Sequence, residues 1–217
     1  MKKKLVIFDL DGTLLDTIAD LAQATNQALR QLGFPVHEEK SYYRFVGSGI
    51  NKLFERALPL QERTAENVAK VRALFVPYYD AHNADLTRPY DGIVPLLEHL
   101  QNSGFLLAIA SNKYQSATEK LVSHYFPQIH FSAVLGQREG LPVKPDPLFV
   151  KEILTLTQTS AQETLYVGDS DVDMMTARNA EVEACAVTWG FRSREELLSF
   201  RPAFVAEQAQ DIAQILA

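Results

Sequence analysis

Apolar residues follow two patterns along this chain, short continuous runs and longer stretches with helical spacing. The run Leu5–Phe8 contains only strand formers and lies between Lys4 and Asp9, which is typical of a buried strand in a parallel sheet. The next stretch has apolar or small residues at the helical period, at Ile18, Leu21, Ala22, Thr25, Leu29 and Leu32. Gly33 and Pro35 indicate that this helix ends there.

Residues 40–83 keep a helical pattern, which breaks at 84–92, where Pro89 and Gly92 occur. Beyond the break, helices and strands alternate. We expect helices over 94–102, 116–125, 147–157 and 173–180, and strands over 105–110, 133–135, 164–167 and 184–188. Ser193 and Glu196 have the capping-box spacing of a further short helix.

This alternation predicts an α/β fold, with a Rossmann-like parallel sheet flanked by helices. The first strand is separated from the other strands by a long helical block, which indicates an insertion. We therefore assign residues 1–15 and 87–217 to an α/β core, and residues 16–86 to an inserted α-helical cap domain.

Composition narrows the class of protein without indicating a reaction. The 217 residues are 47% hydrophobic and 22% charged, as in ordinary globular proteins. No apolar run approaches the ~20 residues of a membrane span. The net charge is −6 and the basic residues are scattered, which argues against a nucleic-acid surface. The lone Cys185 fits a reducing compartment, so we expect a cytoplasmic protein that binds neither membrane nor nucleic acid.

Polar clusters follow the expected strands, at residues 9–13, 111–112, 144–146 and 168–173. Because ligands bind at the carboxyl ends of strands in open α/β sheets, these clusters can converge on one crevice. Asp9 and Asp11 are two residues apart, so both carboxylates can point to the same side. Asp169 would arrive from a different strand. Three carboxylates in one small site repel each other unless a cation lies between them, and oxygen ligands next to phosphate favour Mg²⁺.

The remaining polar residues suit an oxyanionic phosphoryl group. Ser111 offers a hydroxyl and Lys144 a mobile positive charge. Asp9 can then act as nucleophile, with Asp11 as general acid and base. Gly12 lets the backbone turn sharply after the strand.

The same residues resemble the haloacid dehalogenase-like hydrolases. The segment F-D-L-D-G-T-L-L-D-T at 8–17 resembles their first signature. The segments A-S-N-K at 110–113, V-K-P-D-P at 143–147 and V-G-D-S-D-V-D-M at 167–174 are similar to the other three. All four occur in the family's order and spacing, and the resemblance covers essentially the whole chain, including a helical cap.

The resemblance implies a role for each matching residue. Asp9 would be the nucleophile and Asp11 the general acid and base, while Ser111 and Lys144 would hold the phosphoryl group. Mg²⁺ would be bound by Asp9, by the Asp11 backbone carbonyl and by Asp169, with Asp173 beside them. Further phosphate or substrate contacts are assigned to Gly12, Thr13 and Asn112.

The residue two positions after the nucleophile distinguishes activities within this family. Dehalogenases lack the aspartate and the metal, and related transport ATPases carry threonine, so Asp11 implies a phosphatase or a phosphomutase. Similar mutases carry a histidine early in the first cap helix. Here the matching position is near Leu21, and no histidine precedes His37. The resemblance therefore favours a phosphatase.

The cap sequence narrows the substrate. The segment F-V-G-S-G-I-N-K-L-F-E-R-A-L at 45–58 resembles the cap of phosphoglycolate phosphatases, as does V-T-W-G-F-R at 187–192. Gly47 and Gly49 permit close backbone approach, and the helix start that follows favours an anion. A substrate carboxylate fits there, with Gly49 and Arg56 as candidate contacts.

We therefore expect a Mg²⁺-dependent phosphatase that hydrolyses a small phosphorylated metabolite, with 2-phosphoglycolate as the leading substrate, through an aspartyl-phosphate intermediate. The alternatives are an inorganic pyrophosphatase or a sugar phosphomutase of the same family, and a non-enzymatic protein that binds phosphorylated ligands. A monomer or weak homodimer is expected. Simpler roles also exist for individual residues: Asp16 as a helix cap, Asp171 as a solvent-facing side chain and Asp173 as a favourable charge near a helix start.

Overall fold

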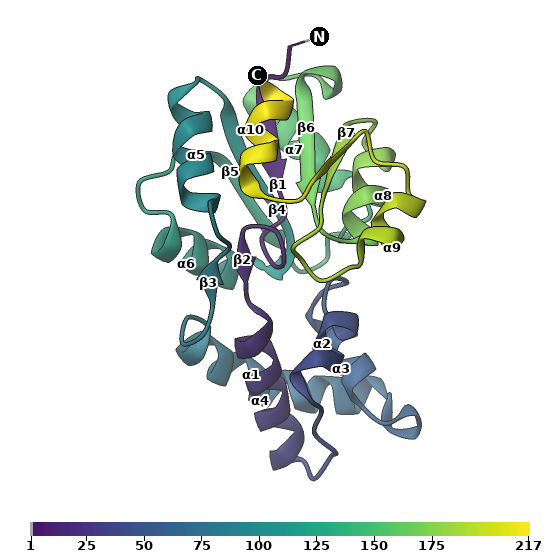
Figure 1. The fold of residues 1–217 in the computed structure, drawn as a ribbon. Helices are drawn as coiled ribbons and strands as arrows, with labels where there is room; N and C mark the ends of the chain where they lie inside the picture. The colour runs from purple at the N-terminus through teal and green to yellow at the C-terminus, as the bar shows by residue number, and fades with distance from the viewer. Residues whose placement is uncertain (1) are drawn as a thin grey trace.

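Within the described residues 2–217 of the computed structural model, six parallel strands form one sheet (Figure 1). Their order across the sheet is β5-β4-β1-β6-β7-β8, and all five strand pairs are parallel. This confirms the predicted α/β class. The strands are β1 (Leu5–Phe8), β4 (Leu106–Tyr114), β5 (Phe131–Gln137), β6 (Thr164–Gly168), β7 (Glu183–Val187) and β8 (Phe204–Ala206).

The central strand β1 shows why the sheet is covered on both faces. Its four residues are fully buried, and they pair with both β4 and β6. Val6 and Phe8 pack into one hydrophobic cluster, while Leu5 and Ile7 pack into another on the opposite face. An uninterrupted apolar strand therefore needs helices on each side.

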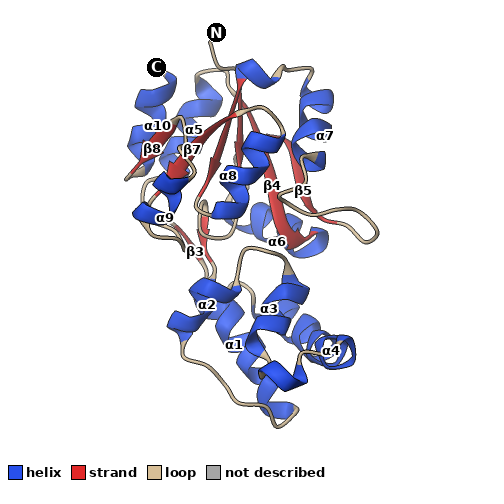
Figure 2. Ribbon diagram, turned by 90° about the vertical axis from the view of Figure 1, so that its right-hand side faces the viewer, coloured by secondary structure: helices blue, strands red, loops and turns tan. Residues whose placement is uncertain are grey.

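Two helical layers supply this cover (Figure 2). One cluster includes residues of α5 (Ile93–Asn102), α6 (Gln115–Tyr125) and α10 (Ala209–Leu216). The other includes residues of α7 (Leu148–Thr157), α8 (Asp171–Asn179) and α9 (Arg194–Ser199). The loops that follow β1, β4 and β6 lie at the end of the sheet that faces the insert (Figure 1).

The insert between β2 and β4 consists of helices, as the sequence predicts, and these helices supply most of one hydrophobic cluster, to which Ala117 and Phe191 of the core also belong. Its helices are α1 (Ile18–Gln31), α2 (Glu39–Phe45), α3 (Ile50–Ala57), the 3₁₀ turn η1 (Leu60–Glu62) and α4 (Ala65–His82). Two short strands connect it to the core, β2 (Leu15–Asp16) and β3 (Arg88–Pro89), which pair antiparallel. The domain boundaries proposed at 15/16 and 86/87 stay a prediction.

Several elements were not predicted from sequence. Strands β2 and β3 contain two residues each and β8 contains three, which is too few for a periodic pattern. Helix α10 was missed although its buried Ala209, Ile212 and Leu216 have helical spacing. Strand β4 runs to Tyr114 rather than ending at residue 110. Ser111 and Asn112 therefore lie within β4, where the register shifts before Tyr114.

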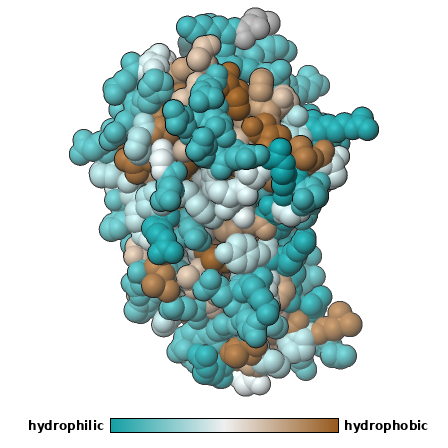
Figure 3. All heavy atoms as spheres, viewed as in Figure 1, coloured by the Kyte–Doolittle hydropathy of each residue, from teal (hydrophilic) through white to brown (hydrophobic). Residues whose placement is uncertain are grey.

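Hydrophilic residues cover most of the surface visible in Figure 3. Among the helices of residues 2–217, none is both long enough and apolar enough to span a bilayer.

Asp20 ties the start of the insert to its end. This carboxylate lies in the first turn of α1 and is only 3% exposed. It accepts hydrogen bonds from the backbone N–H of Leu86 at 3.1 Å and of Thr87 at 2.8 Å, and from the Thr87 hydroxyl at 2.7 Å. The two connections between insert and core are thus held by one buried acceptor.

We predict that Asp20→Ala lowers the free energy of unfolding by about 2–4 kcal/mol, because several donors lose a charged acceptor and two of them are buried. Urea denaturation of the purified variant measures the loss. The exposed neighbour Asp85 provides a matched control, and Asp85→Ala should change stability by no more than about 0.5 kcal/mol. Equal losses for the two variants would show that Asp20 is not a special constraint.

Candidate active site

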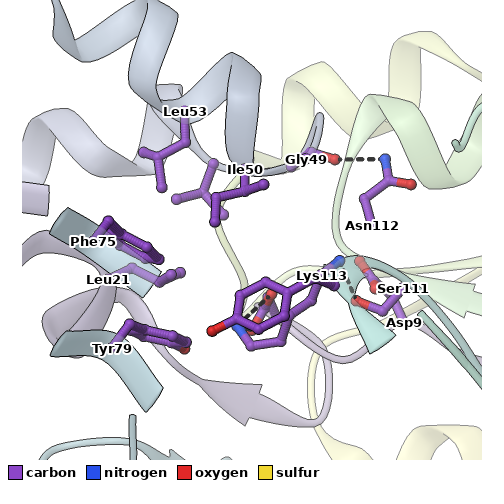
Figure 4. A pocket seen from close by; sticks show the side chains of 14 residues that line it. Asp9, Leu21, Gly49, Ile50, Leu53, Phe75, Tyr79, Ser111, Asn112 and Lys113 are labelled. Atoms are coloured by element: carbon purple, nitrogen blue, oxygen red, sulfur yellow. Dashed lines mark hydrogen bonds and ion pairs between the residues drawn. The ribbon is translucent and has the colours of Figure 1, made fainter. Parts of the chain in front are cut away.

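A pocket lies between the insert and the carboxyl ends of β1 and β4, with about 500 Å³ of space that is partly open to solvent (Figure 4). Its insert side is largely apolar, formed by Leu21, Val46, Ile50, Leu53 and Phe75. Its core side is polar, formed by Asp9, Asp11, Ser111, Asn112 and Lys113. The pocket therefore combines an apolar wall with a group of charged and polar side chains.

Asp9 continues β1 by one residue and points into this pocket. Its backbone N–H donates to the carbonyl of Val167 at 2.9 Å, which fixes it beside the end of β6. Its Oδ1 accepts from the N–H of Leu10 at 2.7 Å and lies 3.0 Å from Lys144 Nζ. Burial raises the pKa of Asp9 well above its ordinary value, and the nearby Asp173 raises it further, while Lys144 acts in the opposite direction.

Lys144 is held rigidly, and the expectation of a mobile charge was wrong. Its side chain is almost fully buried, and Nζ donates to Asp173 Oδ1 at 2.7 Å and to the Tyr166 hydroxyl at 3.1 Å. Burial alone would lower the pKa of this ammonium. The carboxylates of Asp173 and Asp9 outweigh burial, so the pKa of Lys144 is raised well above its ordinary value. A positive charge is therefore fixed beside Asp9.

Asp173 positions Lys144 from the first turn of α8. Its carboxylate is fully buried. Its Oδ2 accepts from the backbone N–H of Ser170 at 3.1 Å and from the Ser170 hydroxyl at 2.6 Å, in a capping box. Its Oδ1 is the atom that meets Lys144. Asp173 therefore caps α8, as its position near a helix start suggested, and also contacts Lys144, which the sequence did not predict.

Asp169 follows the last residue of β6, and its carboxylate lies near those of Asp9 and Asp173. Thr13 Oγ1 donates to its Oδ1 at 3.0 Å, and the N–H of Phe191 donates to its Oδ2 at 2.7 Å. Burial, followed by repulsion from Asp173, raises the pKa of Asp169 to about 7. Gly12 is required beside it: its φ is +87°, and a Cβ there would lie 2.4 Å from Asp169 Oδ2.

The residues present fit a divalent metal. Asp9, Asp169 and Asp173 each offer a carboxylate oxygen, and these oxygens lie within 4.8 Å of one another. All three are oxygen donors, which hard cations prefer. Burial and mutual repulsion raise the pKa values of Asp9 and Asp169, and a cation would relieve this repulsion. The cluster can therefore hold a metal ion.

Asp11 lies in the pocket and pairs with a lysine that the sequence interpretation did not single out. Lys113 Nζ lies 2.9 Å from Asp11 Oδ1 and 3.1 Å from Oδ2, and Thr17 Oγ1 donates to Oδ1 at 2.8 Å. The missed signal was the alternation of side chains along a strand, because Lys113 follows Ser111 by two residues and can share its side. Tyr79, also missed, belongs to a helix whose apolar pattern indicates only core packing.

Asn112, in β4, makes hydrogen bonds both to the loop that carries Lys144 and to the insert. Its Nδ2 donates to the carbonyls of Gly47 at 3.1 Å and of Lys144 at 3.0 Å, while its Oδ1 accepts from the N–H of Lys144 at 2.8 Å. Ser111 lines the pocket beside it, and Ser111 Oγ accepts from the N–H of Lys113 at 3.2 Å. Asn112 thus holds the backbone of Lys144 in place.

The insert contributes Gly49 to the pocket, but Arg56 is not among the lining residues. The Arg56 guanidinium donates to the carbonyl of Phe45 at 2.9 Å and to Ser48 Oγ at 3.0 Å. Arg56 therefore stabilises the turn that contains Gly47 and Gly49. A Cβ on Gly49 would lie 3.2 Å from Gln137 Oε1, so this glycine permits close contact between the insert and β5.

Arg192 is a further residue that sequence reasoning missed. It follows β7 and is buried. It donates to the carbonyls of Tyr43 and Val46 in the insert. Asp171, expected to face solvent, lies 3.2 Å from the Arg192 guanidinium. Asp171 therefore supports a bridge from the core to the insert.

Comparison with known proteins agrees with this geometry. The family described as haloacid dehalogenase-like hydrolase matches residues 6–187. The chain is 32% identical to the phosphoglycolate phosphatase of Vibrio parahaemolyticus, over 99% of this chain and 96% of that protein. It is 34% identical to the phosphoglycolate phosphatase of Mesorhizobium japonicum, over 94% and 91%.

A solved structure also superposes over the full length. The crystal structure of a protein from Lactobacillus delbrueckii subsp. bulgaricus has a TM-score of 0.92 and 32% identity, and the match covers 100% of this chain and 99% of that one. Together with the buried aspartates, the fixed lysine and the helical insert, these matches show that the chain belongs to the haloacid dehalogenase-like hydrolases.

Proposed function

We propose that this protein is a Mg²⁺-dependent phosphatase that hydrolyses a small phosphomonoester, with 2-phosphoglycolate as its leading substrate, through an aspartyl-phosphate on Asp9. The observation that carries the proposal is the buried ion pair between Asp9, which lines the pocket, and Lys144, whose Nζ lies 3.0 Å from Asp9 Oδ1. Lys144 and the Leu10 N–H both contact Oδ1 of Asp9. Among residues 2–217, no hydrogen bond is donated to Oδ2, which leaves this oxygen able to attack phosphorus.

In the first step, Asp9 Oδ2 forms a bond to phosphorus while the bond from phosphorus to the ester oxygen breaks. Asp11 lies in the same pocket and donates a proton to the departing oxygen. Lys144 and the Ser111 hydroxyl stand beside Asp9, where they can stabilise the charge on the phosphoryl oxygens. The products of this step are an alcohol and phosphorylated Asp9.

In the second step, Asp11 removes a proton from a water molecule that attacks the same phosphorus. The bond between phosphorus and Asp9 then breaks, which releases inorganic phosphate, restores the Asp9 carboxylate and leaves Asp11 protonated for the next cycle. The apolar side chains of the insert limit access of bulk water to the pocket during the first step.

Mg²⁺ would be held by the carboxylates of Asp9 and Asp169 and by the Asp11 backbone carbonyl. Its contribution, when bound, is to offset the negative charge of carboxylates and phosphoryl group at close range. Asp173 is assigned a place beside the ion, where its carboxylate also accepts hydrogen bonds from Lys144 and Ser170.

Phosphomutase and pyrophosphatase activities are the alternatives within the same family. Leu21 of α1 lines the pocket, and a leucine cannot transfer a proton, which favours hydrolysis over a mutase reaction. A phosphate-release screen with Mg²⁺ over 2-phosphoglycolate, sugar phosphates, nucleotides and pyrophosphate tests the proposal. Preferred release from pyrophosphate, or no release from any ester, would contradict it.

We predict that Asp9→Asn lowers kcat for phosphate release by ~10³-fold or more, because an amide is a very poor nucleophile. The fold should persist, since the change removes one charge from a crowded carboxylate cluster. Circular dichroism and the thermal midpoint of the variant check that it is folded. A folded variant with wild-type turnover would disprove the covalent mechanism.

Asp11→Asn should slow two substrates unequally. Loss of proton transfer costs about 10²–10⁴-fold with glycolate as leaving group, whereas an aryl phosphate needs little protonation and can still phosphorylate Asp9. The second step then lacks its base, so phosphorylated protein should accumulate. Rates on phosphoglycolate and an aryl phosphate, with intact-protein mass measurement, test this. Equal losses on both substrates without a phosphorylated species would mean that Asp11 does not perform both transfers.

Chelation should abolish phosphate release, and added Mg²⁺ should restore it. Ca²⁺ should inhibit, because its larger and looser coordination disturbs the alignment of the reacting groups. Thermal denaturation gives an independent readout: Mg²⁺ should raise the midpoint of the wild-type protein, and Asp169→Asn should reduce that rise. Asp146→Asn is a matched control, since Asp146 is exposed and lies outside the cluster. Full activity in EDTA would rule out the metal role of Asp169.

A further inference from the structure

Two polar groups in the pocket have no assigned part in the proposed reaction, the Tyr79 hydroxyl and the Lys113 ammonium. Tyr79 belongs to α4 in the insert, and Lys113 belongs to β4 in the core. Both line the pocket, as Figure 4 shows. Lys113 Nζ lies 4.8 Å from the centre of the Tyr79 ring. The two residues therefore form one site shared by insert and core.

The Tyr79 hydroxyl is buried and makes no hydrogen bond with any described residue. Buried hydroxyls are normally paired, because an unpaired one is destabilising. Burial also raises the pKa of Tyr79 well above its ordinary value, so the hydroxyl keeps its proton and can donate. A ligand that brings an acceptor into the pocket would supply the missing partner.

Lys113 can donate a hydrogen bond to the same acceptor. An ammonium has three N–H donors, and its contacts with the two oxygens of Asp11 use at most two of them. At least one N–H remains for a ligand. Lys113 is only 7% exposed, and a buried positive charge favours an anion over a neutral hydroxyl.

The rest of the wall limits what can reach this pair. Leu21, Ile50, Leu53 and Phe75 offer no hydrogen-bonding side-chain atoms. The several hydroxyls of a sugar phosphate would be left without partners against these side chains, and such a loss disfavours binding. A short ligand with one compact anionic group leaves no polar atom unpaired.

We propose that Lys113 and Tyr79 bind a carboxylate at the end of the substrate opposite the phosphoryl group, and so select short phosphorylated carboxylic acids. Each carboxylate oxygen can accept one hydrogen bond, from the ammonium or from the hydroxyl. This inference rests on the proposed phosphatase function. It differs from the sequence-based expectation of a carboxylate near Gly49 and Arg56, because Arg56 donates to Phe45 and Ser48.

The test measures binding to the Asp9→Asn protein by calorimetry in saturating Mg²⁺. The ligands are 2-phosphoglycolate and ethyl phosphate, which differ only in a carboxylate against a methyl group. We expect 2-phosphoglycolate to bind about 10–100-fold more tightly. Adding Tyr79→Phe should reduce this preference about 5- to 10-fold, and adding Lys113→Met should bring it close to one.

Tyr42→Phe is the matched control, since it removes a hydroxyl elsewhere in the insert, one that donates to Asn26 Oδ1 at 2.7 Å. It should leave the preference unchanged. Equal affinities for the two ligands in the parent, no binding of either ligand, or a preference that survives both pocket substitutions would overturn the inference. Because binding needs no turnover, this outcome is separate from failure of the proposed function, which is absence of phosphate release by the unmodified protein.

Discussion

A buried ammonium among carboxylates is the constraint on which the site depends. Lys144 lies within 3.0 Å of Asp9 and 2.7 Å of Asp173. Desolvating these charges is unfavourable unless each is paired and hydrogen-bonded. The pairing is complete only because the capping box of α8 orients Asp173 and because Asn112 holds the backbone of Lys144. The ion pairs therefore form only when the start of α8, the end of β4 and the loop that carries Lys144 lie next to one another.

The same residues connect the chemistry to the insert. Asn112 binds both Lys144 and the Gly47 carbonyl, and Arg192 binds the carbonyls of Tyr43 and Val46. Each contact reaches backbone rather than side chains of the insert. These contacts therefore depend on the path of the insert backbone, whereas Tyr114 and Glu196 of the core contact the side chains of Asp80 and Arg44 in the insert.

Sequence was sufficient where a pattern is carried by neighbouring residues. The run Leu5–Phe8, the alternation of helices and strands and the clusters at the strand ends all predicted features of the observed fold. The convergence of Asp9 and Asp169 followed from the rule for parallel sheets. Sequence was insufficient where the function of a side chain depends on a distant partner. The rigidity of Lys144 depends on Tyr166 and Asp173, and the bracing by Arg56 depends on a turn eight or more residues away.

Lys113 and Tyr79 differ in how far the sequence could have predicted their place in the pocket. Lys113 could have been found if the expected strand had been extended beyond residue 110, since Lys113 follows Ser111 by two positions in β4. Tyr79 could not, because its place opposite β4 is fixed by the packing of the insert on the core. Phe75 and Val71 on the same helix belong to the same hydrophobic cluster as Tyr79, and nothing in the local sequence sets Tyr79 apart from them.

The two short strands that join insert and core have a consequence for the history of such proteins. Because β2 and β3 are paired, the chain leaves the core and returns to it at adjacent points. The helices between these two strands therefore form a loop whose ends are held together. A loop of this kind can lengthen, shorten or be exchanged with little entropic penalty for closing its ends. The insert can therefore diverge while the carboxylates and the lysine at the strand ends stay the same.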